Sequence, residues 1–212
     1  FSDTLAGGGQ NLTIAAGTAA GTTTFTGAVS GMGAAATGAA ITIASTGLAR
    51  FMNTVGGTSG IVSSNAGGST RFDGDVTLAD GDTASSFAGT AQFDGMNWSG
   101  FDGLTVTGAA TLSTGAVSLN SNGGAILFSD TLAGGGQNLT IAAGTLAGTT
   151  TFTGAVSGMG AAATGAAITI DSTGLARFMS TVGGTSGIVS SGAGSTRFDG
   201  DVTLADGDTP SS

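Results

Sequence analysis

The chain has 212 residues, 13 of them acidic and four basic, so its formal net charge is −9, and it contains no histidine or cysteine. This charge excludes the broad basic face that nucleic-acid binding requires, and it disfavours an anionic membrane surface. Lysine and glutamate, the usual exposed helix formers, are absent, which argues against helices, while 40% hydrophobic and 8% charged residues argue against disorder.

A tandem repeat organises the chain. The sequence of 1–86 returns as 128–212, so that Phe1 recurs as Phe128, and one glycine is deleted near Gly67 and Gly68. We therefore divide the chain into a first large repeat, 1–127, and a second, truncated one, 128–212, which form one continuous solenoid without a linker. The two copies differ at five aligned positions: Ala19/Leu146, Ala44/Asp171, Asn53/Ser180, Asn65/Gly192 and Ala84/Pro210.

A shorter period lies inside the large one. A large apolar residue recurs along the first copy, and an aliphatic residue follows most of these positions four places later, as Val29 follows Phe25. The members of this series are Phe1, Phe25, Phe51, Phe72, Phe93, Leu112 and Phe128. Their mean spacing of about 21 residues is typical of solenoid coils. The pattern predicts six coils in the first large repeat and about ten coils in the chain.

Short runs rich in Thr, Val, Ile and Phe lie between glycine-rich turns, as strands do. They alternate apolar and polar residues, so the apolar ones are expected on one face. In chain order the expected strands are 11–14, 22–26, 41–43, 49–55, 61–62, 70–78, the regions of 87, 93 and 98, then 104–106, 112, 117–119 and 125–128.

The simplest fold that uses this pattern is all-β, a right-handed parallel β-solenoid whose coils stack about 4.8 Å apart. Glycine supplies the corners. The alternative is a β-sandwich of many short strands, which does not need aromatic residues in phase. In the solenoid, equivalent side chains form an interior column, the expected core ladder: Phe1, Phe25, Phe51, Phe72, Phe93, Leu112, Phe128, Phe152, Phe178 and Phe198.

Aspartate pairs separated by a glycine recur in both copies. Carboxylates at such spacing on a turn can share a hard cation such as Ca²⁺, although Asp-Gly pairs also simply end strands and keep turns hydrated. We expect no cofactor, with Ca²⁺ as the one alternative. The calcium candidates are Asp73, Asp75, Asp80, Asp82, Asp199, Asp201, Asp206 and Asp208.

The same carboxylates, Asp73 and Asp75 in particular, fit a polysaccharide-cleaving pair, because some β-solenoid enzymes hydrolyse glycans with aspartate. A sugar cleft would also need bases and further aromatic residues, and lysine, histidine and tyrosine are absent. We expect no enzyme and no catalytic residue.

All four arginines directly precede an expected interior Phe: Arg50, Arg71, Arg177 and Arg197. They should therefore point outward, where they can pair with Asp73, Asp75 or an aspartate of a neighbouring rod. Surface pairs of this kind usually contribute little to stability.

The segments Gly-Thr-Thr-Thr-Phe-Thr-Gly-Ala-Val (21–29) and Ala-Ala-Ile-Thr-Ile (39–43) resemble repeats of very large bacterial surface proteins. These are the filamentous-haemagglutinin-like and autotransporter-passenger-like β-solenoids. The resemblance implies an extracellular or cell-surface location and a role as adhesin or surface fibre. The secretion domain of those families is not found in this sequence.

Neither end of the sequence carries the polar cap that closes a soluble solenoid, so either more chain flanks this segment or separate molecules stack end to end. The expected partners are further copies of the chain, end to end and side by side. The first hypothesis is an extracellular structural protein that forms a fibre, stalk or surface filament. The alternative is an adhesin shaft that binds cells or glycans, with a receptor site around Phe87, Phe93, Trp98 and Phe101 if Trp98 is exposed. No nucleic acid and no membrane span are expected.

Overall fold

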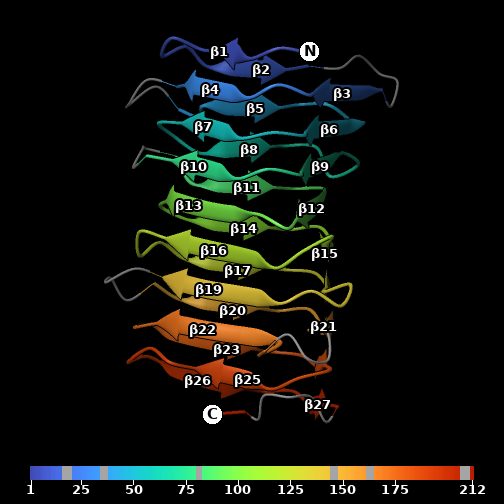
Figure 1. The fold of residues 1–212 in the computed structure, drawn as a ribbon, viewed down its shortest axis with the longest axis vertical. Helices are drawn as coiled ribbons and strands as arrows, with labels where there is room; N and C mark the ends of the chain where they lie inside the picture. The colour runs from blue at the N-terminus through green and yellow to red at the C-terminus, as the bar shows by residue number, and fades with distance from the viewer. Residues whose placement is uncertain (16–20, 34–37, 80–82, 144–147, 161–164, 206–210) are drawn as a thin grey trace.

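The computed structural model describes residues 1–15, 21–33, 38–79, 83–143, 148–160, 165–205 and 211–212. It is an all-β parallel solenoid, in which 27 short strands form three sheets of nine strands each (Figure 1). The predicted fold class is thereby confirmed. The described residues include no helix long and apolar enough to cross a membrane.

The chain visits three sheets, here called A, B and C, in strict rotation. Sheet A contains β1 (Leu5–Ala6), β4 (Val29–Met32), β7 (Val55–Gly57), β10 (Val76–Leu78), β13 (Asn97–Phe101), β16 (Val117–Ser121), β19 (Leu139–Ala143), β22 (Ile168–Ser172) and β25 (Ile188–Ser190). Sheet B contains β2 (Leu12–Ile14), β5 (Ile41–Ile43), β8 (Ile61–Ser63), β11 (Ser85–Phe87), β14 (Leu104–Val106), β17 (Ile126–Phe128), β20 (Thr150–Phe152), β23 (Leu175–Phe178) and β26 (Ser195–Phe198). Sheet C contains β3 (Thr22–Phe25), β6 (Leu48–Phe51), β9 (Ser69–Phe72), β12 (Thr90–Asp94), β15 (Ala110–Ser113), β18 (Leu132–Ala133), β21 (Val156–Met159), β24 (Val182–Gly184) and β27 (Val202–Leu204).

Alternation decides which side chains enter the core. In β5, Ile41 and Ile43 are buried and Thr42 between them faces outward. In β9, Thr70 and Phe72 are buried whereas Arg71 remains partly exposed. Because each strand pairs in register with the strand one turn later, equivalent residues form columns along the axis.

One corner of the solenoid, between sheets B and C, is built from stacked glycines. A Cβ added to Gly47 would lie 1.8 Å from the carbonyl oxygen of Gly21, and one added to Gly89 would lie 2.0 Å from that of Gly68. The corner backbones therefore touch directly, and no larger residue fits there at this coil spacing.

The core contains two aromatic stacks instead of the single expected ladder. Phe1, Phe25, Phe51, Phe72 and Phe93 stack along sheet C with ring centroids 4.9 to 6.3 Å apart. Phe128, Phe152, Phe178 and Phe198 form a second stack along sheet B, with centroids 4.7 to 5.2 Å apart. Leu112 continues the first stack, since it pairs with Phe93. All ladder residues are buried except Phe1 and Phe198, which lie at the two ends.

The two stacks arise from the length of the large repeat. Strands β1–β10 of the first copy recur as β18–β27, so one repeat advances the chain by 17 strands, which is five and two-thirds turns. Each copy is thus rotated by one third of a turn relative to the other. The predicted count of about ten coils was too high, and the structure has about eight of roughly 22 residues. The prediction counted the short interval between Leu112 and Phe128 as a whole coil. In the structure this interval leads from β15 to β17, an advance of two strands, whereas a whole coil has three.

Candidate functional site

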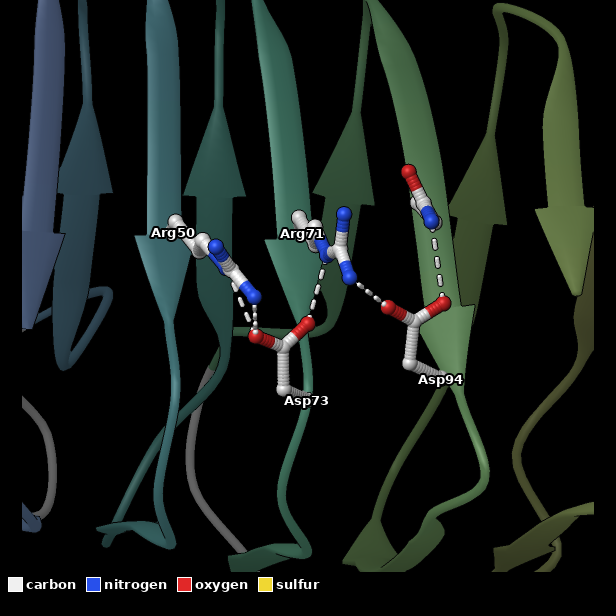
Figure 2. Close-up of polar contacts among 5 residues, drawn as sticks. Arg50, Arg71, Asp73 and Asp94 are labelled. Carbon is white, nitrogen blue, oxygen red and sulfur yellow. Dashed lines mark hydrogen bonds and ion pairs between the residues drawn. The ribbon is translucent and has the colours of Figure 1, made fainter. Parts of the chain in front are cut away.

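The most organised polar cluster on the surface is a row of charged side chains along sheet C (Figure 2). We call it the first Arg–Asp row; it comprises Arg50, Arg71, Asp73, Gln92 and Asp94. Arg50 in β6 and Arg71 in β9 are direct partners in the sheet, and each precedes a buried Phe, so both point outward as predicted. Two like charges then stand one strand apart, which is unfavourable unless acids separate them.

Asp73 separates those two charges, and Asp94 lies on the other side of Arg71. Asp73 accepts a hydrogen bond of 2.6 Å at Oδ2 from Nε of Arg50, and one of 2.5 Å at Oδ1 from Nε of Arg71. Nη2 of Arg71 lies 2.5 Å from Oδ2 of Asp94, one strand further on. Nε2 of Gln92 donates to the other oxygen of Asp94 at 3.0 Å. The row therefore links three successive coils, and its two positive charges are balanced by two negative ones.

The two carboxylates of this row differ in acidity. Burial alone would raise the pKa of Asp73, but hydrogen bonds from Arg71 and Arg50 outweigh it, and the pKa is lowered. Burial dominates at Asp94 and raises its pKa, although Gln92 and Arg71 act in the opposite direction. The hydrogen bond to Asp73 raises the pKa of the Arg71 guanidinium. The row thus holds one firmly ionised acid and one acid that protonates more readily.

The second copy repeats only part of this arrangement, on sheet B. Asp199 accepts hydrogen bonds of 2.6 Å from Nε of Arg177 and from Nε of Arg197, and these lower its pKa. Sheet B ends at β26, so Arg197 has no counterpart of Asp94 one coil further on among the described strands. Its side chain is 63% exposed, against 28% for Arg71. We call these three residues the second Arg–Asp row.

The calcium candidates that the structure describes do not form a cluster. Asp73 and Asp199 are engaged by arginines, and Asp75 accepts a hydrogen bond of 2.8 Å from the backbone N–H of Asn97. Asp201 is exposed beside β27. Asp80, Asp82, Asp206 and Asp208 lie outside the described residues. Within the part of the chain that is described, no three acidic residues gather closely enough to hold a metal ion.

The aromatic receptor site considered for the adhesin hypothesis is not on the surface. Trp98 is fully buried and contacts Phe72, Phe87, Phe93 and Phe101 edge to face, with centroids 5.1 to 6.0 Å apart. The adhesin alternative required an exposed Trp98 for this site, and that condition is not met.

A shallow groove of about 430 Å³ does lie on the outer face of sheet C, beside the first Arg–Asp row. Its polar walls are formed by Ser69, Thr90, Arg71 and Gln92, and the Ser69 and Thr90 hydroxyls lie 2.7 Å apart. Neither Gln92 nor Asp94 was among the site residues predicted from the sequence. The signal was present, because Arg71-Phe72-Asp73 and Gln92-Phe93-Asp94 share one pattern of a polar residue, Phe and Asp.

Comparison of the chain with protein-family models, with curated proteins and with solved structures gave no match to any of them.

Proposed function

We propose that this chain is a structural repeat protein of the cell exterior that forms a fibre, stalk or surface filament by coil stacking and lateral packing. The bacterial surface fibres that its repeats resemble support this proposal.

One observation carries the proposal: the core is open to solvent at both ends of the described rod. Phe1 is 70% exposed at one end, and Phe198 and Val202 are 40% and 41% exposed at the other. At these ends the outermost strands of the sheets, such as β1 and β27, have one hydrogen-bonding edge without a described neighbouring strand. Exposed apolar columns next to unpaired strand edges favour the addition of further coils.

The test is electron microscopy and sedimentation of the purified 212-residue chain over a wide range of concentrations. We expect rods whose width stays constant and whose length increases in steps of one chain. Particles that stay at the size of one chain at every concentration would contradict the proposal.

The groove beside the first Arg–Asp row favours a second candidate, an adhesin shaft that binds glycans. Hydroxyl, amide and guanidinium groups around an open, shallow surface suit the hydroxyls of an extended sugar chain. Binding to immobilised glycans should weaken in Gln92→Ala and persist in Thr203→Ala, which changes an exposed residue of the same sheet far from the groove. Equal binding by both variants would rule out this site.

A further inference from the structure

The two ends of the rod present the same residue spacing. At one end Phe1 is followed four positions later by Leu5, and at the other Phe198 is followed four positions later by Val202. Inside the molecule this pair repeatedly stacks on its equivalent: Phe25 and Val29 lie on Phe51 and Val55, which lie on Phe72 and Val76. The exposed ends are therefore two halves of a contact that the protein already makes.

The two halves lie on different faces. Phe1 stacks on Phe25 of sheet C, and Leu5 begins β1 of sheet A. Phe198 ends β26 of sheet B, and Val202 begins β27 of sheet C. Aligning both pairs requires sheet C of the molecule that contributes Phe1 to continue sheet B of the molecule that contributes Phe198. This is the same one-third turn that separates the two copies within the chain.

We propose that a second copy of this chain docks head to tail with Phe1 on Phe198 and Leu5 on Val202, rotated by one third of a turn about the rod axis. The inference rests on the proposed function and specifies the contact behind it. Such a contact is heterologous, and because each molecule is displaced along the rod axis it cannot close into a ring, so it builds a filament. Ignoring the twist of the sheets, the orientation repeats every three molecules, so that the fourth molecule has the orientation of the first.

The competing unrotated contact matches the columns less well. It would continue sheet C with sheet C, and Phe1 would then meet Leu204, which ends that column. Phe198 would gain no aromatic partner, although an open cavity of about 450 Å³ lined by Ile188, Thr196, Phe198 and Val202 lies there to receive a ring. Stacked aromatic pairs add stabilisation beyond the area that they bury.

Cysteine cross-linking distinguishes the two contacts, because the chain has no cysteine of its own. In the rotated contact Thr4 lies next to Asp201, as Thr4 lies next to Ala28 within the molecule. In the unrotated contact Ser2 lies next to Ala205. Adjacent parallel strands bring Cα atoms within disulfide range. We expect Thr4→Cys with Asp201→Cys to give ladders of covalent multimers under mild oxidation, and Ser2→Cys with Ala205→Cys to give none.

The outcomes are separable. If neither the parent chain nor the variants assemble, the proposed function and this inference both fail. If filaments form but the second cysteine pair cross-links, or neither pair does, the rotated contact is wrong and the proposed function stands.

A second measurement does not depend on disulfide geometry. Phe198→Ala should raise the concentration needed for assembly at least about tenfold, because the end loses its aromatic surface. Met52→Ala, at an equally exposed residue on the side wall, should leave it unchanged. Equal assembly by both variants would overturn the contact.

Discussion

At the scale of single residues, the tandem copies provide matched pairs in different surroundings. Asp73 and Asp199 occupy equivalent positions, and each accepts hydrogen bonds from two arginines. Asp73 is the less exposed of the two, and its partner Arg71 is tied to the next coil through Asp94. We expect Asp73→Asn to lower the free energy of unfolding in urea by about 1–2 kcal/mol, and Asp199→Asn to lower it clearly less, because solvent screens the more exposed pairs. Equal losses would show that the link to Asp94 contributes nothing.

The pH dependence of stability provides a second test at this scale. Burial raises the pKa of Asp94 above its ordinary value of 3.8, so the folded protein binds this proton more tightly than the unfolded chain does. Binding of this proton stabilises the folded protein fully below pH 3.8, and this stabilisation is lost as the pH rises through the pKa of Asp94 in the folded protein. Asp94→Asn stays neutral, so its stability relative to the parent should increase over this interval and then level off.

Asp73→Asn is the control for that experiment. The pKa of Asp73 is lowered, so the stability that its carboxylate contributes is present above pH 3.8 and is lost as pH falls through the folded pKa. The deficit of this variant should therefore shrink towards low pH. Urea unfolding of both variants from strongly acidic to neutral pH checks the two signs. A deficit of Asp94→Asn that grows with pH would mean that the ion pair with Arg71 outweighs burial.

At the scale of elements, the corner glycines fix how closely the coils stack. Gly89 lies directly over Gly68, and an added Cβ would meet its carbonyl oxygen at 2.0 Å, whereas an added Cβ at Gly21 meets nothing within 4 Å. We expect Gly89→Ala to lower the free energy of unfolding by at least about 2 kcal/mol. Gly21→Ala should change it by less than about 0.5 kcal/mol, and denaturant unfolding measures both. Equal effects of the two substitutions would show that the corner is loose.

Elements of this kind were largely predictable from the sequence. Alternation in Ile41–Ile43 and the outward position of Arg50 and Arg71 follow from strand geometry alone. The sequence predicted glycines at the corners, but it did not predict that they stack in direct contact. A contact such as that of Gly89 on Gly68 depends on the spacing between coils. The ion pair between Arg71 and Asp94 needs the alignment of β9 with β12, which a sequence period gives only when the coils are equal in length.

At the scale of the whole molecule, the phase of the repeat was the feature that the sequence concealed. The return of Phe1 as Phe128 is evident in the sequence. The large repeat contains 17 strands, from β1 to the start of β18, and this number depends on the positions of the corners between the sheets. Phe128 therefore looked like the next member of the column of Phe93. In the fold it belongs to the column of sheet B instead, because it pairs with Val106 of that sheet. Identical sequence thus faces two directions on one rod, and the second Arg–Asp row lies on a different sheet from the first.

The solenoid also predicts how stability is distributed along the rod. Each coil contacts only its neighbours, so coils at the ends lose support on one side. Trp98, packed among four Phe rings, lies far from both ends. Amide hydrogen exchange at concentrations that keep the chain monomeric should be slowest in β12–β14 and faster towards β2 and β26. Trp98→Leu should remove this maximum and leave exchange at the ends almost unchanged, because a cavity at the centre weakens only the adjoining coils. Uniform exchange along the parent chain would mean that the rod unfolds as one cooperative unit and that neighbour contacts do not set its local stability.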